Sequence, residues 1–281
     1  MKDKLLIQNF KEVMKKNLSI ETFNILINNI EKVKIKHRRN NDKDITITTG
    51  NIDDKGIITL YEQDDITLYH ELFHASSTYY DEKQDNSFRG FHHHLRNPQK
   101  FIGLGFNEGY TQLLTERYFN NSQSCDSYVN EVHYVKLIEN LIGKEKMLDL
   151  YFKSDLNNLI LELCKNNSEE QVFEFLTNMD LFIISDKIRK DKVKQMKNGL
   201  PSLEDIQFME DMDKKIYDTY ISLNQFIIES YMNKSYNETS FNIKKEDLIQ
   251  LMSKPLSFNF KEYPVDVEKQ INEYYDSSRK I

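Results

Sequence analysis

Two histidines four residues apart, His70 and His74, enclose a glutamate in the segment HELFH at positions 70–74. Residues 66 to about 80 predict a helix, on which side chains four positions apart lie on one face. Both imidazoles can therefore reach one metal ion, and Glu71 can reach a water molecule on that ion. In this HExxH pattern the imidazoles are typical zinc ligands and the carboxylate is a typical general base.

A catalytic zinc ion takes three protein ligands and keeps a fourth position open. The tripeptide Asn107-Glu108-Gly109 supplies a candidate for the third ligand, because Glu108 lies near the start of a second expected helix, residues 108 to about 118. Asn107 is expected to be the N-cap of that helix, and this alone would explain it.

HExxH followed by an NEG tripeptide that opens an amphipathic helix resembles the gluzincin metallopeptidases. The resemblance covers roughly residues 30–120. It implies that His70 and His74 are zinc ligands, that Glu108 is the third ligand and that Glu71 is the general base. It also implies a zincin-like fold, in which the strand at residues 56–61 is the edge strand that pairs with an extended peptide substrate.

The chain departs from well-known gluzincins in three respects. The interval from His74 to Glu108 is longer than in thermolysin-like and aminopeptidase-like members. Gln112 stands where thermolysin-like enzymes carry an acidic residue that orients a histidine, and an amide raises ligand basicity less than a carboxylate does. The GxMEN-type signature of exopeptidases is missing upstream, which argues against an aminopeptidase.

The function implied by the resemblance is zinc-dependent hydrolysis of a peptide bond in a peptide or protein substrate. The metal would lower the pKa of a water molecule, and Glu71 would take its proton and pass it to the leaving amine. Two other interpretations stay open. The site can be a non-catalytic zinc centre of an intracellular interaction or regulatory protein, or the chain can be a toxin or effector that cleaves one protein.

Further polar residues are candidates for supporting roles. His92, His93 and His94 are expected at a polar loop tip, or as a cleft wall with one histidine donating to the transition-state oxyanion. Glu116 lies on the face of Glu108 and can support a histidine or pair with a lysine. Gluzincins usually present a tyrosine or histidine to the tetrahedral intermediate, for which the candidates are Tyr110, His133 and Tyr134.

The expected fold class is α+β and predominantly helical, with a small mixed sheet packed on the HExxH helix. An α/β subdomain at residues 1–106 would carry HExxH, and a helical subdomain at residues 107–281 would begin with the Glu108 helix. Residues 81–106 are expected to form a long irregular loop. Strands are expected at 33–37, 45–49 and 56–61 with a turn at 51–56, and other helices at 4–16, 20–29, 126–142, 144–152, 155–165, 169–190, 203–232, 245–252 and near 265–275.

The composition of the chain argues against some classes of binding partner. A net charge of −7 argues against nucleic-acid binding. The N-terminus lacks the apolar segment of a signal peptide, and the longest apolar runs are too short for a membrane span. Cys125 and Cys164 are far apart and are expected to be reduced thiols. A cytoplasmic protein is therefore expected, while its substrate specificity and oligomeric state stay open.

Overall fold

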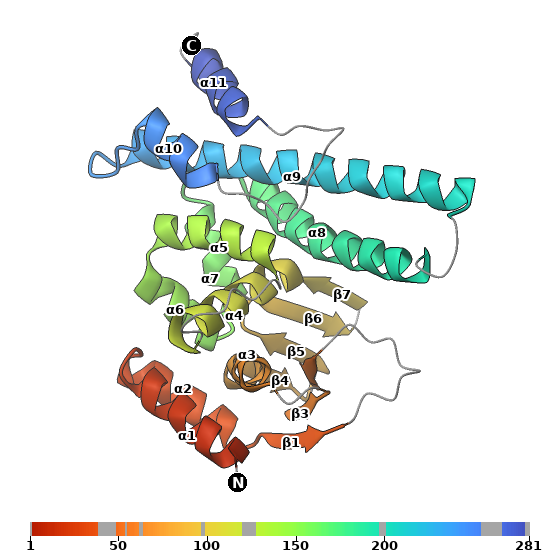
Figure 1. Ribbon diagram of the computed structural model, residues 1–281. Coiled ribbons are helices and arrows are strands. Elements are labelled where there is room, and N and C mark those ends of the chain that lie inside the picture. Colours follow the sequence, from red (N-terminus) through yellow and green to blue (C-terminus); the bar gives the residue numbers. More distant parts are fainter. Residues whose placement is uncertain are drawn as a thin grey trace. The chain divides into compact units, whose positions relative to one another are not determined.

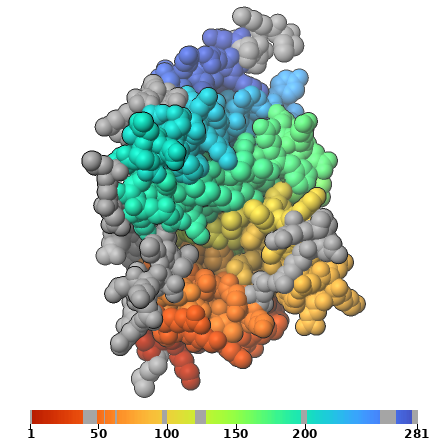
Figure 2. Space-filling view, turned by 90° about the vertical axis from the view of Figure 1, so that its right-hand side faces the viewer, coloured from red at the N-terminus to blue at the C-terminus, as the bar shows by residue number. Residues whose placement is uncertain are grey.

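The computed structural model describes residues 2–38, 49–53, 55–61, 64–96, 99–119, 128–196, 201–253 and 266–278 (Figure 1). The chain forms two compact units, Met1–Ser127 with Gly143–Leu159, and Tyr128–Ile142 with Ile160–Ile281. Figure 2 shows one face of the molecule with its segments in the colours of Figure 1. The expected α+β class with a helical majority is confirmed.

The described helices and strands follow one another along the chain without an internal repeat. They are α1 (Lys2–Lys15), α2 (Ile20–Ile30), β1 (Lys34–His37), β2 (Gly50–Ile52), β3 (Ile57–Leu60), α3 (Asp65–Ser76), β4 (Thr78–Asp81), β5 (Asn86–Arg89), β6 (His92–Arg96), β7 (Gln99–Ile102), α4 (Leu104–Phe119), α5 (Val129–Ile142), α6 (Lys144–Phe152), α7 (Leu156–Leu163), α8 (Glu169–Met196), α9 (Leu203–Asn237), α10 (Lys245–Met252) and α11 (Val267–Ser278).

Helix α3, which carries HExxH, lies at the centre of the first unit, with α1 and α2 on one side (Figure 1). The carboxylate of Asp64 caps its N-terminus by accepting the N–H groups of Ile66 and Thr67 at 3.2 and 3.0 Å. Every residue from Leu68 to Ser76 is buried. A helix enclosed on all sides must satisfy its polar side chains inside the protein.

The first sheet has the strand order β1-β3-β2 and packs against α3. Strand β3 pairs in parallel with β1 and antiparallel with β2. The expectation that residues 56–61 form an edge strand is therefore wrong, because both sides of β3 are paired. The edge strand beside α3 is β2, part of which was expected to be a turn. Most of the expected strand at 45–49 lies outside the described residues.

A second sheet, of order β4-β5-β6-β7, occupies most of the segment expected to be an irregular loop. All its strands pair antiparallel with their neighbours in the chain. The hairpin between β5 and β6 turns through Gly90 and Phe91, and Gly90 has the positive φ of +53° that a glycine tolerates in such a turn. The histidines at 92–94 therefore lie on strand β6 rather than at a loop tip.

Helix α4 begins at Leu104, earlier than expected, because the N–H of Asn107 already donates to the carbonyl of Gly103 at 2.9 Å. Asn107 is therefore inside the helix and is not its N-cap. Helix α4 packs along α3 and belongs to the first compact unit, whereas a place in a second, helical subdomain is expected from the sequence. The division into two domains at residue 106 stays a prediction.

The second unit is helical, and its longest helices, α8 and α9, pack along each other. A capping box between Ser202 and Asp205 starts α9. The hydroxyl of Tyr134 in α5 donates to Asn224 in α9 at 2.9 Å, inside this unit. None of the helices in the described part of the chain combines the length and hydropathy needed to cross a bilayer.

Candidate metal centre

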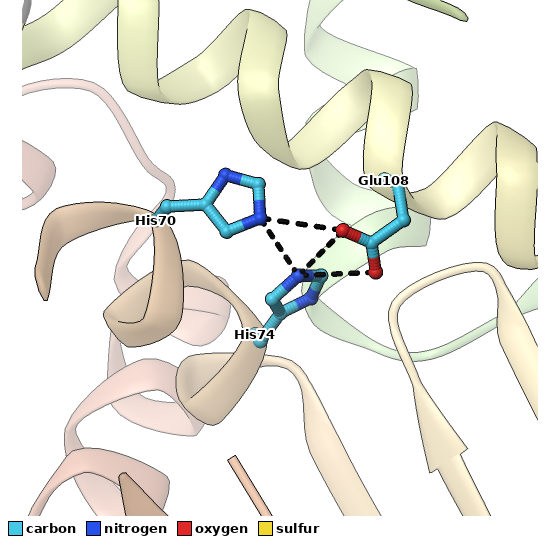
Figure 3. Close-up of side chains that lie close together, drawn as sticks. All are labelled: His70, His74 and Glu108. Atoms are coloured by element: carbon cyan, nitrogen blue, oxygen red, sulfur yellow. Dashed lines mark hydrogen bonds and ion pairs between the residues drawn. The ribbon is translucent and has the colours of Figure 1, made fainter. Parts of the chain in front are cut away.

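The three predicted ligands converge on one point between α3 and α4 (Figure 3). The Nε2 atoms of His70 and His74 lie 3.1 Å apart, and each lies 3.3 Å from Oε2 of Glu108. Zinc–ligand bonds of 2.0–2.2 Å in a tetrahedron place neighbouring ligand atoms about 3.3 Å apart. The donor atoms could therefore hold a metal ion, and their spacing is compatible with zinc.

The two helices supply this geometry through residue spacing. His70 and His74 stand one turn apart on α3 and present both rings to α4. Glu108 stands in the second turn of α4, so its carboxylate reaches back across the helix interface towards both rings (Figure 3). In the described part of the chain, this is the one group of three or more metal-ligating side chains.

The outer nitrogen of His70 is held by Gln112, one turn beyond Glu108. The amide oxygen of Gln112 lies 3.2 Å from His70 Nδ1, while its amide nitrogen donates to Glu116 at 3.3 Å. The amide therefore accepts from Nδ1–H, which leaves the lone pair of Nε2 free for a metal. Glu116 therefore contacts the amide group that holds His70.

Two buried side chains of α4 face the outer nitrogen of His74. Asn107 Nδ2 lies 3.3 Å and Thr111 Oγ1 lies 3.4 Å from His74 Nδ1. The amide oxygen of Asn107 accepts the backbone N–H of Phe91 at 3.0 Å, so its nitrogen, a donor, faces the ring. Thr111 is therefore the group able to accept a hydrogen bond from Nδ1–H. Its hydroxyl lies 2.7 Å from that of Tyr151.

Neither Thr111 nor Tyr151 was singled out from the sequence. The positions of Thr111 and Gln112, three and four residues after Glu108, place them on its helix face and are a usable signal. The role of Tyr151 has no such signal, because it depends on α6 packing against α4 from forty residues further along the chain.

The general-base candidate Glu71 is buried beside the ligands. Burial raises the pKa of its carboxyl, although the charges of His74 and His70 oppose this. Strand β2 passes directly over it: a Cβ atom added to Gly50 would lie 3.1 Å from Glu71 Oε1 and 2.7 Å from Thr67 Cγ2. A raised pKa suits a carboxylate that must accept a proton and release it again.

Without a metal, the charges of His70, His74 and Glu108 influence one another's pKa values. Burial alone would raise the pKa of Glu108, but the charge of His74 and the hydrogen bonds from both histidines hold it well below its usual range. Burial alone would lower the pKa of His70, yet the bond and charge of Glu108 raise it. A carboxylate and two imidazoles in this arrangement attract a cation, which is a proton when no metal is bound.

The other sequence candidates have structural partners elsewhere. Tyr134 and His133 belong to the second unit, where the Tyr134 hydroxyl is bonded to Asn224. Tyr110 is buried in the first unit, with its ring against those of Phe91 and Tyr151. The geometry of these residues favours packing over a role in chemistry.

Comparison with family models, curated proteins and solved structures finds no match for this chain. The likeness to gluzincins therefore rests on HExxH and the NEG tripeptide, together with the convergence of their side chains.

Proposed function

We propose that the protein is a zinc-dependent metallopeptidase of gluzincin type. The observation that carries this proposal is the convergence of His70, His74 and Glu108 on one point, with the buried carboxylate of Glu71 beside it. Three ligands from the described residues leave a tetrahedral ion one open position, which is typical of catalytic zinc. A purely structural zinc site has no use for a general base, so the non-catalytic alternative is less well supported.

The residues divide the work of hydrolysis between them. A bound zinc ion would supply Lewis acidity, which lowers the pKa of water in the open position and polarises the scissile carbonyl. Glu71 takes a proton from the attacking water and delivers it to the leaving nitrogen. Gln112 and Thr111 keep the ligand imidazoles in the tautomer that offers Nε2 to the metal.

Strand β2 is the element best placed to bind an extended peptide. It has one paired side, against β3, in the described sheet, and at Gly50 it approaches Glu71 closely. A peptide that adds to its other side would gain main-chain hydrogen bonds and would lie next to the general base. This role replaces the one expected for residues 56–61. The substrate is accordingly a peptide or protein, and we expect a cytoplasmic enzyme.

The test compares zinc-loaded wild type with Glu71→Gln on a mixed peptide library, with cleavage read by mass spectrometry. Glutamine keeps the size of the side chain but is no base, so cleavage is expected to fall by about 100-fold or more while zinc content stays unchanged. Equal cleavage by both proteins would refute the mechanism. Zinc binding without cleavage of any library peptide by wild type would favour the non-catalytic zinc centre.

A further inference from the structure

The second sheet lies in the chain between two of the proposed ligands, His74 and Glu108, and a single residue joins it to each ligand-bearing helix. Ser77 connects α3 to β4, and Gly103 connects β7 to α4. The turn between β5 and β6, at residues 90 and 91, returns to both of these helix ends. This sheet can therefore influence how the two ligands are placed relative to each other.

The turn is hydrogen-bonded to both sides of the metal centre. The N–H of Gly90 donates to the carbonyl of Ser77, the residue after α3, at 3.0 Å. The N–H of Phe91 donates to the side-chain oxygen of Asn107 at 3.0 Å. Asn107 is fully buried, precedes the glutamate ligand in α4, and its amide nitrogen lies 3.3 Å from Nδ1 of His74. Two consecutive N–H groups thus hold the end of the histidine helix and the start of the glutamate helix.

Phe91 anchors the turn against α4 through its side chain and its main chain. Its ring is buried, with centroids 5.4 Å from the ring of Phe106, 5.5 Å from that of Tyr110 and 5.6 Å from that of Tyr151. Its carbonyl oxygen lies so close to Gly103 that a Cβ atom on that glycine would overlap it. A displacement of the turn must therefore displace its neighbours in α4, because close-packed interiors transmit strain.

Gly90 is the residue that this arrangement requires. A Cβ atom at this position would overlap Oδ1 of Asn107 and would lie 2.5 Å from Cε2 of Tyr151. Any side chain here must push the turn away from Asn107. Gly56 provides a comparison, because its φ of +72° is also positive, like the +53° of Gly90, but an added Cβ would lie 3.9 Å from its nearest neighbour, the carbonyl oxygen of Lys32.

We propose that Gly90 is a positioning residue of the metal centre, an inference that rests on the proposed zinc peptidase function. The turn that Gly90 permits holds Asn107 in place and thereby fixes Glu108 opposite His74. The bond from Phe91 also orients the amide of Asn107, because its oxygen is occupied by the turn. Coupling between two sites is reciprocal. Zinc bound between α3 and α4 should therefore hold the turn more firmly.

The first test compares the zinc affinity of wild type, Gly90→Ala and Gly56→Ala by competition with a chelator. Both substitutions place a methyl group at a positive φ, but only Gly90→Ala crowds Asn107. Each protein is also loaded with Co²⁺, whose visible absorption spectrum reports the geometry of the ligands and is not moved by a loss of stability alone. Circular dichroism checks that each variant is folded.

We expect Gly90→Ala to raise the zinc dissociation constant by about 10-fold or more, as other disturbances of groups around metal ligands do. Its Co²⁺ spectrum should differ from that of wild type. Gly56→Ala should match wild type in zinc affinity and in the Co²⁺ spectrum.

The second measurement needs no variant. Hydrogen exchange of wild type is followed by mass spectrometry with and without zinc. We expect zinc to slow exchange in residues 86–96 by about 10-fold or more, and to leave α8 in the second unit unchanged.

A folded Gly90→Ala with the zinc affinity and Co²⁺ spectrum of wild type would overturn the positioning role and leave the metal centre intact. If Gly90→Ala does not fold, the exchange measurement decides, and unchanged exchange of residues 86–96 on zinc binding would overturn the role. A wild type that binds no zinc would instead contradict the proposed function.

Discussion

The hydroxyl of Tyr151 in α6 lies 2.7 Å from the hydroxyl of Thr111 in α4, and Thr111 lies 3.4 Å from the outer nitrogen of His74. Both hydroxyls are buried. When the Thr111 oxygen accepts from His74 Nδ1–H, its own proton is directed to Tyr151. Helix α6 contributes no ligand of its own. Through this pair of hydroxyls it nevertheless helps to orient His74, a proposed metal ligand.

Replacing Thr111 by valine should weaken zinc binding. Valine has nearly the same shape but accepts no hydrogen bond, so His74 loses the partner that holds its metal-binding tautomer. Mutations of such partners typically cost 10–100-fold in metal affinity, and we expect about a 10-fold rise in the zinc dissociation constant, measured by competition with a chelator. Thr115→Val is the control, because Thr115 is equally buried on α4 but bonds to the Thr111 carbonyl. Equal affinities in the two variants would remove Thr111 from the site.

Replacing Gly50 by alanine should disturb the general base without removing the metal. The added methyl group would lie 2.7 Å from Thr67 and 3.1 Å from Glu71, so strand β2 or these side chains must shift. Overpacking of this kind costs about 1–3 kcal/mol. We expect a lower free energy of unfolding in urea and slower turnover with unchanged zinc content. Asn51→Ala, at the exposed next position, is the control, and equal behaviour of the two variants would argue against close contact at Gly50.

Stability of the metal-free protein should decrease as the pH rises above neutrality. The pKa of His70 is raised in the folded state, chiefly by Glu108 acting against burial. Its stabilising contribution is therefore complete below the unfolded pKa of about 6.5 and is lost as the pH rises through the folded pKa. Glu108 affects stability at acid pH. Its pKa is lowered in the folded state, so its stabilising contribution is lost as the pH falls through that pKa.

Thermal unfolding of chelator-treated protein between about pH 6 and pH 9 measures this effect. We expect Tm to fall across that range in wild type and to fall less in Glu108→Gln, which lacks the charge that raises the pKa of His70. Zinc affinity should change in the opposite direction, since the metal displaces a proton from His70 and binds more tightly at higher pH. A wild-type Tm that rises with pH over this range would contradict the assigned coupling.

The residues of the site could be predicted from sequence because the information is local. The two histidines of HExxH are four residues apart, so they lie on one face of any helix that contains them. Asp64 marks where that helix begins. The N-cap signal of α2 is equally local, because the side chain of Ser19, the residue before the helix, accepts the N–H of Thr22. The convergence of Glu108 with the histidines came from the resemblance, and the packing of α4 along α3 agrees with it.

The second sheet was missed because its strands lack the apolar alternation that identifies a strand. Strand β6 begins with three histidines, and β5 carries Asn86, Ser87 and Arg89. Their pairing depends on neighbouring hairpins and on anchors such as the bond from His93 to Ser154, which are not visible in a short window of sequence. The order β1-β3-β2 was missed for the same reason, since the position of a strand within a sheet depends on its partners.

Metal analysis of the purified protein tests the central claim most directly. Wild type, Glu71→Gln, His74→Ala and Glu108→Ala are reconstituted with zinc, freed of excess metal and measured by elemental analysis. We predict about one zinc per chain in wild type and Glu71→Gln, and loss of zinc in both alanine variants, because two protein ligands bind zinc far more weakly than three. Zinc retained by Glu108→Ala would show that Glu108 is not a ligand and would end the gluzincin assignment. A wild type that binds no zinc would contradict the metal centre altogether.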